Sequence, residues 1–206
     1  MSSAADPVHP PHPFVLASSS PRRRDLLRSA GLSFDVDPST ISEAPEPDEP
    51  PRSYVRRIAA EKARGVAHRL RTGGDIRPVL AADTIVVLGD MLGKPESRDA
   101  ALNMLLRLSG QWHEVITAFC LIDARGSEQR QEVVTRVQFK QLLPREIEAY
   151  LALGEWRDKA GGYGIQGGAA FMVRQIGGSY TNVVGLPLCE AVEALSRLGL
   201  TVGQRA

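Results

Sequence analysis

The chain has 206 residues, of which 43% are hydrophobic and 24% charged, and its formal net charge at pH 7 is +1. These values are typical of a globular protein that is long enough to bury a core without disulfides. A net charge near zero argues against a surface built to bind nucleic acid. No apolar run approaches the ~20 residues that a membrane helix needs, and the N-terminus has no hydrophobic signal region.

We therefore expect a cytoplasmic protein that binds neither nucleic acid nor a membrane. Cys120 and Cys189 lie in apolar surroundings without metal-ligand spacing, which predicts two buried thiols in a reducing compartment. Residues 1–13 are rich in proline and predict an irregular tail, and residues 14–206 are expected to form a single domain.

Hydrophobic periodicity and turn residues predict the elements of the first half of the chain. In order, they are a strand at 14–17, a helix at 21–30, a strand at 34–37, an acidic loop at 38–51, a helix at 52–71 and a buried strand at 79–88.

The second half predicts a short strand at 91–92, a helix from Ser97 to Gly110, and a hairpin of strands at 113–122 and 131–140. A helix at 144–153, a glycine-dense stretch at 161–168, a strand near 171–176 and a helix at 187–198 follow. Because the hairpin excludes a purely parallel sheet, we expect an α/β or α+β sheet covered by helices.

The first candidate site is the strand-to-helix junction that contains Ser18, Ser20, Arg22 and Arg23. A helix N-terminus offers unpaired N–H groups to an anion, and arginine adds a fork that suits phosphate oxygens. Arginine side chains at this position are repelled by the positive end of the helix dipole, and a bound anion would offset that repulsion. The alternative is that Ser20 only caps the helix and the arginines are solvated.

Asp83 interrupts the buried strand at 79–88, where a carboxylate is poorly suited to folding. A metal ligand or a base that activates water would explain it. The alternative is a strand-edge carboxylate that accepts hydrogen bonds from the backbone.

Three further side chains are of interest. Lys62 lies on the apolar side of its helix, Lys94 follows a short strand, and Gln166 lies in the glycine-dense stretch. Each has an ordinary explanation, respectively a lysine that extends from the core to water, a solvated turn residue and an incidental amide. Gln166 has both a donor and an acceptor, so it could also read the edge of a base.

The polar residues do not form a nucleophile–base pair, because neither His68 nor His113 has a recognisable partner. Anion donors, cations, a carboxylate and an amide instead indicate a phosphate ester or nucleotide as substrate, attacked by water with metal assistance.

Four segments together resemble the Maf family: LASSSPRRRDLL, AADTIVVLGDMLGKP, LSGQWHEVIT and GGYGIQGGAAFMVRQIGGSYTNVVGLPL. They have the family's order and spacing, and they span residues 14–198. The resemblance implies a Maf/ITPase-like elongated α/β fold, with a central mixed sheet flanked by helices and a cleft between two lobes. It also implies a cytoplasmic, commonly homodimeric nucleoside triphosphate pyrophosphatase that requires a divalent metal cation, Mg²⁺ or Mn²⁺.

The resemblance also assigns roles to residues at matching motif positions. Asp83 matches the proton acceptor, and Glu43 and Asp83 are expected to hold the metal. The phosphate-binding positions are Ser18, Ser20, Arg22, Arg23, Lys62 and Lys94. The positions tied to substrate choice are Arg22, Thr84 and Gln166, which resemble the subgroup that hydrolyses dTTP and UTP, with modified pyrimidine triphosphates as further candidate substrates.

One departure from the family keeps other functions open. The family usually has Asp-Glu after the second strand, whereas this chain has Ser42-Glu43. Either metal affinity is lower, or Glu43 and Asp83 suffice. The departure favours a nucleotide-binding regulator of septum formation with little turnover. Another alternative keeps the chemistry with a different base, such as 7-methyl-GTP, whose subgroup has an acidic residue in place of Gln166.

Overall fold

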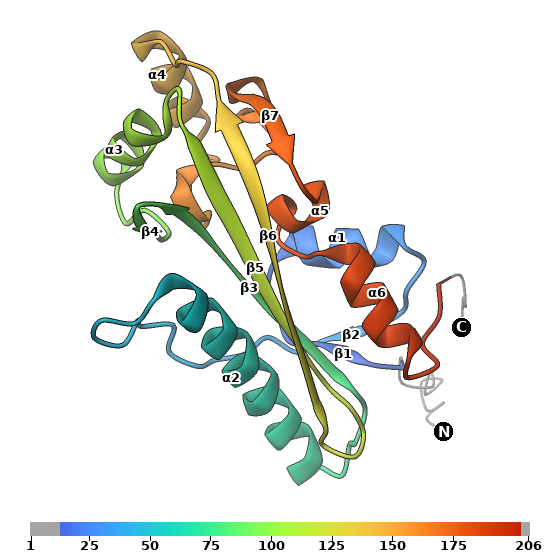
Figure 1. The fold of residues 1–206 in the computed structure, drawn as a ribbon. Helices are drawn as coiled ribbons and strands as arrows, with labels where there is room; N and C mark the ends of the chain where they lie inside the picture. Colours follow the sequence, from blue (N-terminus) through green and yellow to red (C-terminus); the bar gives the residue numbers. More distant parts are fainter. Residues whose placement is uncertain (1–12, 203–206) are drawn as a thin grey trace, which may run out of the picture.

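The fold is built around a long, twisted, mixed β-sheet, seen in a computed structural model that describes residues 13–202 (Figure 1). Within these residues the sheet has seven strands. They are β1 (Val15–Leu16), β2 (Asp35–Val36), β3 (Val79–Leu88), β4 (Asp90–Leu92), β5 (Trp112–Ile122), β6 (Glu128–Phe139) and β7 (Val173–Gly177). The strand order is β2-β1-β3-β5-β6-β7, with β4 paired to β3. β2, β1 and β3 are parallel, and the other pairs are antiparallel.

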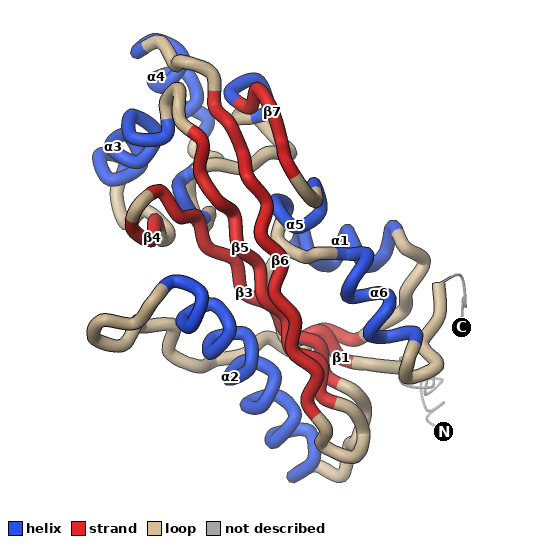
Figure 2. Tube along the Cα trace, in the orientation of Figure 1, coloured by secondary structure: helices blue, strands red, loops and turns tan. Residues whose placement is uncertain are grey.

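Helices cover both faces of this sheet (Figure 2). They are α1 (Pro21–Ser29), α2 (Pro51–Thr72), α3 (Arg98–Leu108), α4 (Pro144–Leu153), α5 (Tyr180–Val184) and α6 (Leu188–Ser196). Two 3₁₀ turns, Ala160–Gly162 and Ala170–Met172, lie in the glycine-dense part of the chain. Proline begins α1, α2 and α4, where its missing N–H costs no helical hydrogen bond.

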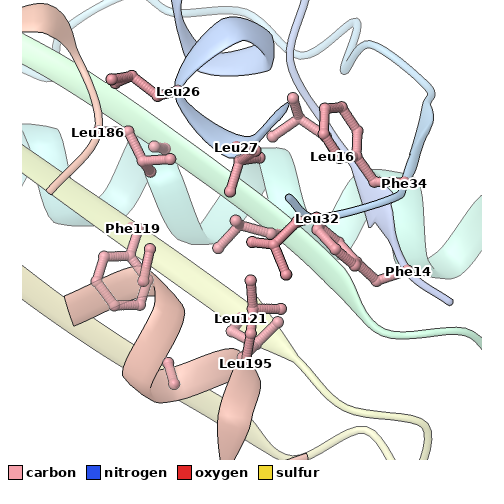
Figure 3. Packing of buried hydrophobic residues seen from close by; sticks show 14 of the residues in the cluster. Phe14, Leu16, Leu26, Leu27, Leu32, Phe34, Phe119, Leu121, Leu186 and Leu195 are labelled. Atoms are coloured by element: carbon pink, nitrogen blue, oxygen red, sulfur yellow. The ribbon is translucent and has the colours of Figure 1, made fainter. Parts of the chain in front are cut away.

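Alternation along β3 assigns the two faces of the sheet. Leu80 and Ala82 pack into one cluster with residues of α1 and α6. Figure 3 shows Leu26 and Leu27 of α1 and Leu195 of α6 in this cluster. Val79 and Ala81 pack into another cluster with α2. Because successive side chains of a strand point to opposite faces, α2 covers one face, and α1 and α6 cover the other. Burial of these leucine, valine and aromatic side chains is the main force that holds the layers together.

A third hydrophobic cluster surrounds the far ends of the long strands. It joins α3 and α4 to the ends of β5 and β6 through buried side chains that include Leu105, Phe139, Tyr150 and Met172. The molecule is therefore elongated, with α1, β1, β2 and α6 forming one lobe and α3, α4 and residues 156–172 forming the other (Figure 1).

The expected architecture is confirmed: the sheet is mixed, the hairpin is present as β5 and β6, and helices flank the sheet. The predicted irregular tail lies almost entirely outside the described residues. No helix of the described chain is both long and apolar enough to cross a membrane.

One expectation was wrong. Cys120 is buried, but Cys189 is exposed, because α6 turns Ala191, Ala194 and Leu195 toward the core and Cys189 toward solvent. The short helix α5 was not among the elements expected from the sequence.

Candidate active site

A cavity of about 430 Å³ lies where the edge of β3 is exposed. β1 pairs with β3 only at Val79 and Leu80, and β4 pairs with it from Val86 onward. Between these pairings the strand edge has no neighbour on that side, and Asp83 and Thr84 line the cavity. The chain that leaves β1 enters α1 beside the same opening. The sheet topology therefore brings the first candidate junction next to Asp83.

All the residues expected to form the site line this one cavity. They are Ser18, Ser20, Arg22, Arg23, Glu43, Lys62, Asp83, Thr84, Lys94 and Gln166. They come from both lobes and from α2, so the cavity lies between the two lobes, as the resemblance implied. The roles of the individual residues remain predictions at this point.

Lys62 joins the two acidic residues of the site. Its Nζ lies 2.8 Å from Asp83 Oδ1 and 2.8 Å from Glu43 Oε1. Glu43 Oε2 lies 3.3 Å from the Nζ of Lys94, which is more exposed. Asp83 shares the α2 face of the sheet with Val79 and Ala81, so alternation along β3 points it toward the helix that carries Lys62. The alternative of an Asp83 held by backbone donors is not what the structure shows.

The electrostatics of this cluster favour the ionised form of Glu43. Burial alone would raise the pKa of Glu43, but hydrogen bonding to Lys62 and the charges of Lys62 and Lys94 outweigh it, and the pKa is lowered. Lys62 and Asp83 are both buried, with about a tenth of each side chain exposed. A buried charge is stable only when it is paired, so each member of the cluster holds the others in place.

Arg23 forms the floor of the cavity on the other face of β3. Its Nε donates to the carbonyl of Gly185 at 2.7 Å, and its Nη atoms donate to Ser18 Oγ and Thr84 Oγ1, both at 3.1 Å. Gly185 itself has φ of +126°, a value that favours glycine. Burial lowers the pKa of Arg23, and the nearby Asp83 opposes this effect.

The Arg23 contacts refine two sequence-based expectations. The hydroxyl of Thr84 also lies 2.9 Å from the hydroxyl of Thr117, so it belongs to a polar network inside the protein. Ser18 accepts hydrogen bonds from Arg23 and from the backbone N–H of Ser20. The structure thus assigns Ser18 and Thr84 internal partners, in addition to their position on the cavity wall.

Arg22 and Ser20 face the cavity differently. The side chain of Ser20 makes no capping hydrogen bond, so the first N–H groups of α1 keep their capacity to bind an anion. In the described chain, no hydrogen bond or ion pair holds Arg22, and its pKa is lowered by burial, against the opposing charge of Asp158. A partly buried, unpaired guanidinium is costly unless an anion joins it.

Sequence reasoning missed Arg157, Asp158 and Lys159, which line the cavity as well. Asp158 and Lys159 lie near enough to Arg22 for their charges to interact. Burial lowers the pKa of Lys159, and the nearby charge of Arg22 lowers it further. Asp158 adopts a left-handed φ of +59°, which is uncommon outside glycine. Three consecutive charged residues, one residue before the glycine-dense stretch, were the available signal. Gln166 also lines the cavity and is exposed.

Ser42 does not line the cavity among the described residues. Its side chain is exposed, and its hydroxyl accepts from the N–H of Ala44 at 3.3 Å, a local turn that an aspartate could also form. Serine in place of the family's aspartate at position 42 therefore affects a local turn and does not change the residues that line the cavity.

The residues present fit a divalent cation that is shared with a substrate. Within the described residues there is no cluster of three or more acidic, histidine or cysteine side chains that could hold a metal alone. Glu43 and Asp83 supply two carboxylates, which lie close together because both pair with the ammonium group of Lys62. Mg²⁺ is commonly bound through one or two carboxylates together with substrate phosphates.

A sheet-edge cavity with a carboxylate pair, several cations and an uncapped helix N-terminus defines an enzyme site for a phosphorylated substrate. The model of the Maf-like protein family matches residues 13–198, and the chain belongs to this family.

Curated relatives share about half of their residues with this chain. A protein of Geobacter sulfurreducens, named dTTP/UTP pyrophosphatase, is 54% identical over 187 residues, which cover 90% of this chain and 96% of that protein. One of Mesorhizobium japonicum with the same name is 48% identical and covers 92% and 93%. A solved nucleoside-triphosphatase / dITP/XTP pyrophosphatase of Mycobacterium abscessus has 18% identity and a TM-score of 0.42, covering 90% of this chain and 93% of that one.

Proposed function

We propose that this protein is a nucleoside triphosphate pyrophosphatase that hydrolyses dTTP and UTP to the nucleoside monophosphate and pyrophosphate. The observation that carries the proposal is the cluster of Asp83, Lys62 and Glu43, which lines a cavity large enough for a nucleotide. The family match and the names of the relatives support the same reaction.

In the proposed reaction, water attacks the α-phosphorus. A bond forms between the water oxygen and the α-phosphorus, and the bond from that phosphorus to the bridging oxygen of the β-phosphate breaks. Pyrophosphate leaves with the electron pair. Asp83 orients the water and accepts its proton, since its carboxylate lines the cavity and is held by the Nζ of Lys62 at 2.8 Å.

The cations of the cavity stabilise the charge that develops. Negative charge accumulates on the non-bridging oxygens and on the departing pyrophosphate, and donors aimed at that charge lower the barrier. Arg22 and the N-terminal N–H groups of α1 are unpaired donors on the cavity wall, joined by Lys62 and Lys94. Ser18, Ser20 and Arg23 complete the phosphate-binding segment of the proposal.

A divalent cation, Mg²⁺ or Mn²⁺, belongs to the same proposal. Glu43 and Asp83 would hold it, and it would neutralise phosphate charge and act as a Lewis acid when bound. The pKa of Glu43 is lowered by its lysine partners, so this carboxylate is ionised at neutral pH and ready to bind a cation.

Base recognition is assigned to Gln166, with Arg22 and Thr84 shaping the choice of substrate. The amide of Gln166 can donate to the O4 acceptor and accept from the N3–H donor of thymine or uracil. A carboxylate in its place would lose the donor. We therefore expect Gln166→Glu to reduce pyrophosphate release from dTTP and UTP relative to GTP, and an unchanged preference would exclude Gln166 as the reader of the base.

Hydrolysis of dTTP in ¹⁸O-labelled water tests the position of attack. Attack at the α-phosphorus puts the label in dTMP, and mass spectrometry of the products detects it. Label found only in pyrophosphate would mean attack at the β-phosphorus and would contradict the proposed roles of Asp83 and Arg22. Asp83→Asn serves as the inactive control.

We also propose that the protein is located in the cytoplasm and forms homodimers. Exposed apolar side chains around α4 and the turn at 170–172, namely Leu143, Leu153 and Phe171, support self-association. Light scattering after size-exclusion chromatography should give twice the 22.3 kDa chain mass. A monomer at micromolar concentration would contradict the dimer, and cell fractionation tests the compartment.

A further inference from the structure

The loop that carries Glu43 has little regular structure of its own. Residues 38–50 contain no helix or strand, and the segment 45–50 includes Pro45, Pro47 and Pro50. Its internal backbone hydrogen bond joins the N–H of Glu49 to the carbonyl of Glu46 at 3.2 Å. A loop of this kind keeps one conformation only when side chains hold it, because fixing each residue costs about 1–2 kcal/mol of conformational entropy.

Two side chains of α2 hold this loop at its backbone. The hydroxyl of Tyr54 donates to the carbonyl of Glu43 at 2.8 Å. One turn later, Nη2 of Arg57 donates to the carbonyl of Ala44 at 3.2 Å. Burial raises the pKa of Tyr54 to about 12, with smaller contributions from Asp83 and Glu43, so the hydroxyl keeps its proton at neutral pH.

Arg57 also binds the far end of the loop through Glu49. Its Nε and Nη2 lie 2.7 and 2.6 Å from the two carboxylate oxygens of Glu49, a two-point contact that fixes orientation as well as distance. Oε2 of Glu49 also accepts from the N–H of Glu46 at 3.1 Å, which folds the loop onto the same carboxylate. Glu61, one turn along α2, holds the remaining Nη1 at 3.3 Å.

These contacts tie Glu43 to the helix that also carries Lys62. Tyr54, Arg57 and Lys62 lie along α2, so the helix fixes both the loop backbone and the ammonium that the Glu43 carboxylate reaches at 2.8 Å. Arg57 itself does not line the cavity among the described residues. Its effect on the site must therefore pass through the loop.

We propose that Arg57 is a positioning residue for the reaction, which holds the loop at residues 43–49 so that the carboxylate of Glu43 faces Lys62, Asp83 and the cation-binding side of the cavity. The inference rests on the proposed function through the role of Glu43. On this account, side chains of α2 keep the acidic loop in one conformation. Arg57 and Glu49 together form a clamp that closes the loop onto the helix.

The test is a double-mutant cycle on Arg57 and Glu43. The variants are Arg57→Gln, Glu43→Gln and the double variant, with Arg57→Lys as the conservative change. Arg77→Gln is the matched control, because the side chain of Arg77 is nearly as exposed as that of Arg57 (22% against 21%) and, like Arg57, binds more than one carboxylate, among them those of Asp75 and Asp35, away from the cavity.

Three readouts are needed: kcat for dTTP, thermal unfolding, and Mn²⁺ bound in the presence of a non-hydrolysable dTTP analogue, measured by electron paramagnetic resonance. We expect Arg57→Gln to lower kcat about tenfold and to weaken Mn²⁺ binding about fivefold, since a misplacement of about 1 Å can cost up to ~10²-fold. The double variant should match Glu43→Gln within about twofold, because Arg57 acts through Glu43. Arg57→Lys should recover part of the loss, and Arg77→Gln should leave kcat and Mn²⁺ binding unchanged.

The possible outcomes separate the inference from the proposal beneath it. If Glu43→Gln lowers kcat and Mn²⁺ binding while Arg57→Gln changes neither, the positioning role is wrong and the role of Glu43 stands. If the two effects multiply in the double variant, Arg57 acts by another route and the inference fails. If Glu43→Gln itself changes neither readout, the proposed role of Glu43 fails, and the inference falls with it. If Arg57→Gln and Arg77→Gln lowered kcat and Mn²⁺ binding equally, general destabilisation of the protein would explain the loss, and the inference would be overturned.

Discussion

Replacement of Lys62 by methionine is the most informative change to the charged cluster. Methionine keeps most of the apolar stem of lysine and removes the ammonium that lies 2.8 Å from both Asp83 and Glu43. At an effective dielectric constant of 20, each contact has a gross attraction of roughly 6 kcal/mol, much of it offset by desolvation. Removing one partner of a buried pair costs about 3–5 kcal/mol.

The structure narrows that range. The side chain of Glu43 is 38% exposed, so Glu43 can turn toward water, whereas Asp83 is nearly enclosed. We therefore expect Lys62→Met to lower the free energy of unfolding by about 3 kcal/mol at pH 7. Asp83→Asn should cost less, because Lys62 keeps Glu43 as a partner.

The contact between Glu43 and Lys62 also makes the free energy of unfolding depend on pH. Contact with Lys62 lowers the pKa of Glu43 despite its burial, so in the native protein this carboxylate contributes stability above pH ~4.5 that is lost as the pH falls. Loss of Lys62 removes the contribution. The difference in stability between the native chain and Lys62→Met should therefore shrink as the pH is lowered from about 5 toward about 3.

Urea unfolding followed by circular dichroism measures these differences. Lys140→Met is the control, because Lys140 pairs with Glu146 at 2.5 Å outside the cavity and is about three times as exposed as Lys62. It should cost no more than about 1 kcal/mol. If Lys62→Met were as stable as Lys140→Met at pH 7, or if its loss were the same at pH 7 and at about pH 3, the reasoning about the cluster would be wrong.

Three further predictions concern single side chains. Asp83→Asn should lower kcat for dTTP by ~10²–10⁴-fold with the circular dichroism spectrum unchanged, and near-native turnover would remove Asp83 from the proton-accepting role. Lys159→Met should raise KM for dTTP about tenfold, the value of one charge-assisted hydrogen bond, and an unchanged KM in steady-state assays would show that Lys159 does not reach the substrate. Burial lowers the pKa of His113 to about 4, so stability should fall by up to roughly 3 kcal/mol as the pH drops from about 6.5 to 4. His113→Gln should flatten this slope in urea unfolding, and an equally steep slope in the variant would assign it to other groups.

Much of the fold could be predicted from local sequence signals. The long helix α2 and the strand β3 follow from sustained periodicity, and their observed bounds differ from the expected ones by at most one residue. β1 and β2 are shorter than expected, two residues each, because parallel pairing lasts only from Val15 to Leu16 on β1.

The elements that sequence patterns missed depend on tertiary contacts. α5 consists of Tyr, Thr, Asn and two Val, all weak helix formers. It forms because Ser179 caps its N-terminus and because Asn182 donates from inside the protein to Val115 and Thr135. Nothing in the local sequence reports these partners.

Some residues of the candidate site could be predicted from the sequence, whereas their contacts could not. Asp83 is conspicuous as a single charge in an apolar run, and Lys62 as a cation on an apolar helix stripe. Their mutual contact could not be foreseen, because it depends on which face of β3 packs against α2. The charged residues at 157–159 and the clamp at Arg57 were missed because each looks like a solvated charge until the fold gives it a partner.

The central claim, pyrophosphate release from dTTP and UTP, is tested most directly by a panel of nucleoside triphosphates with Mg²⁺ or Mn²⁺. Pyrophosphate and orthophosphate are measured separately. We predict pyrophosphate from dTTP and UTP, little from purine triphosphates or 7-methyl-GTP, and no orthophosphate as a primary product. Orthophosphate alone would place the cleavage at the terminal phosphate, and binding of dTTP without any product would favour a regulator over an enzyme. Either result would contradict the account.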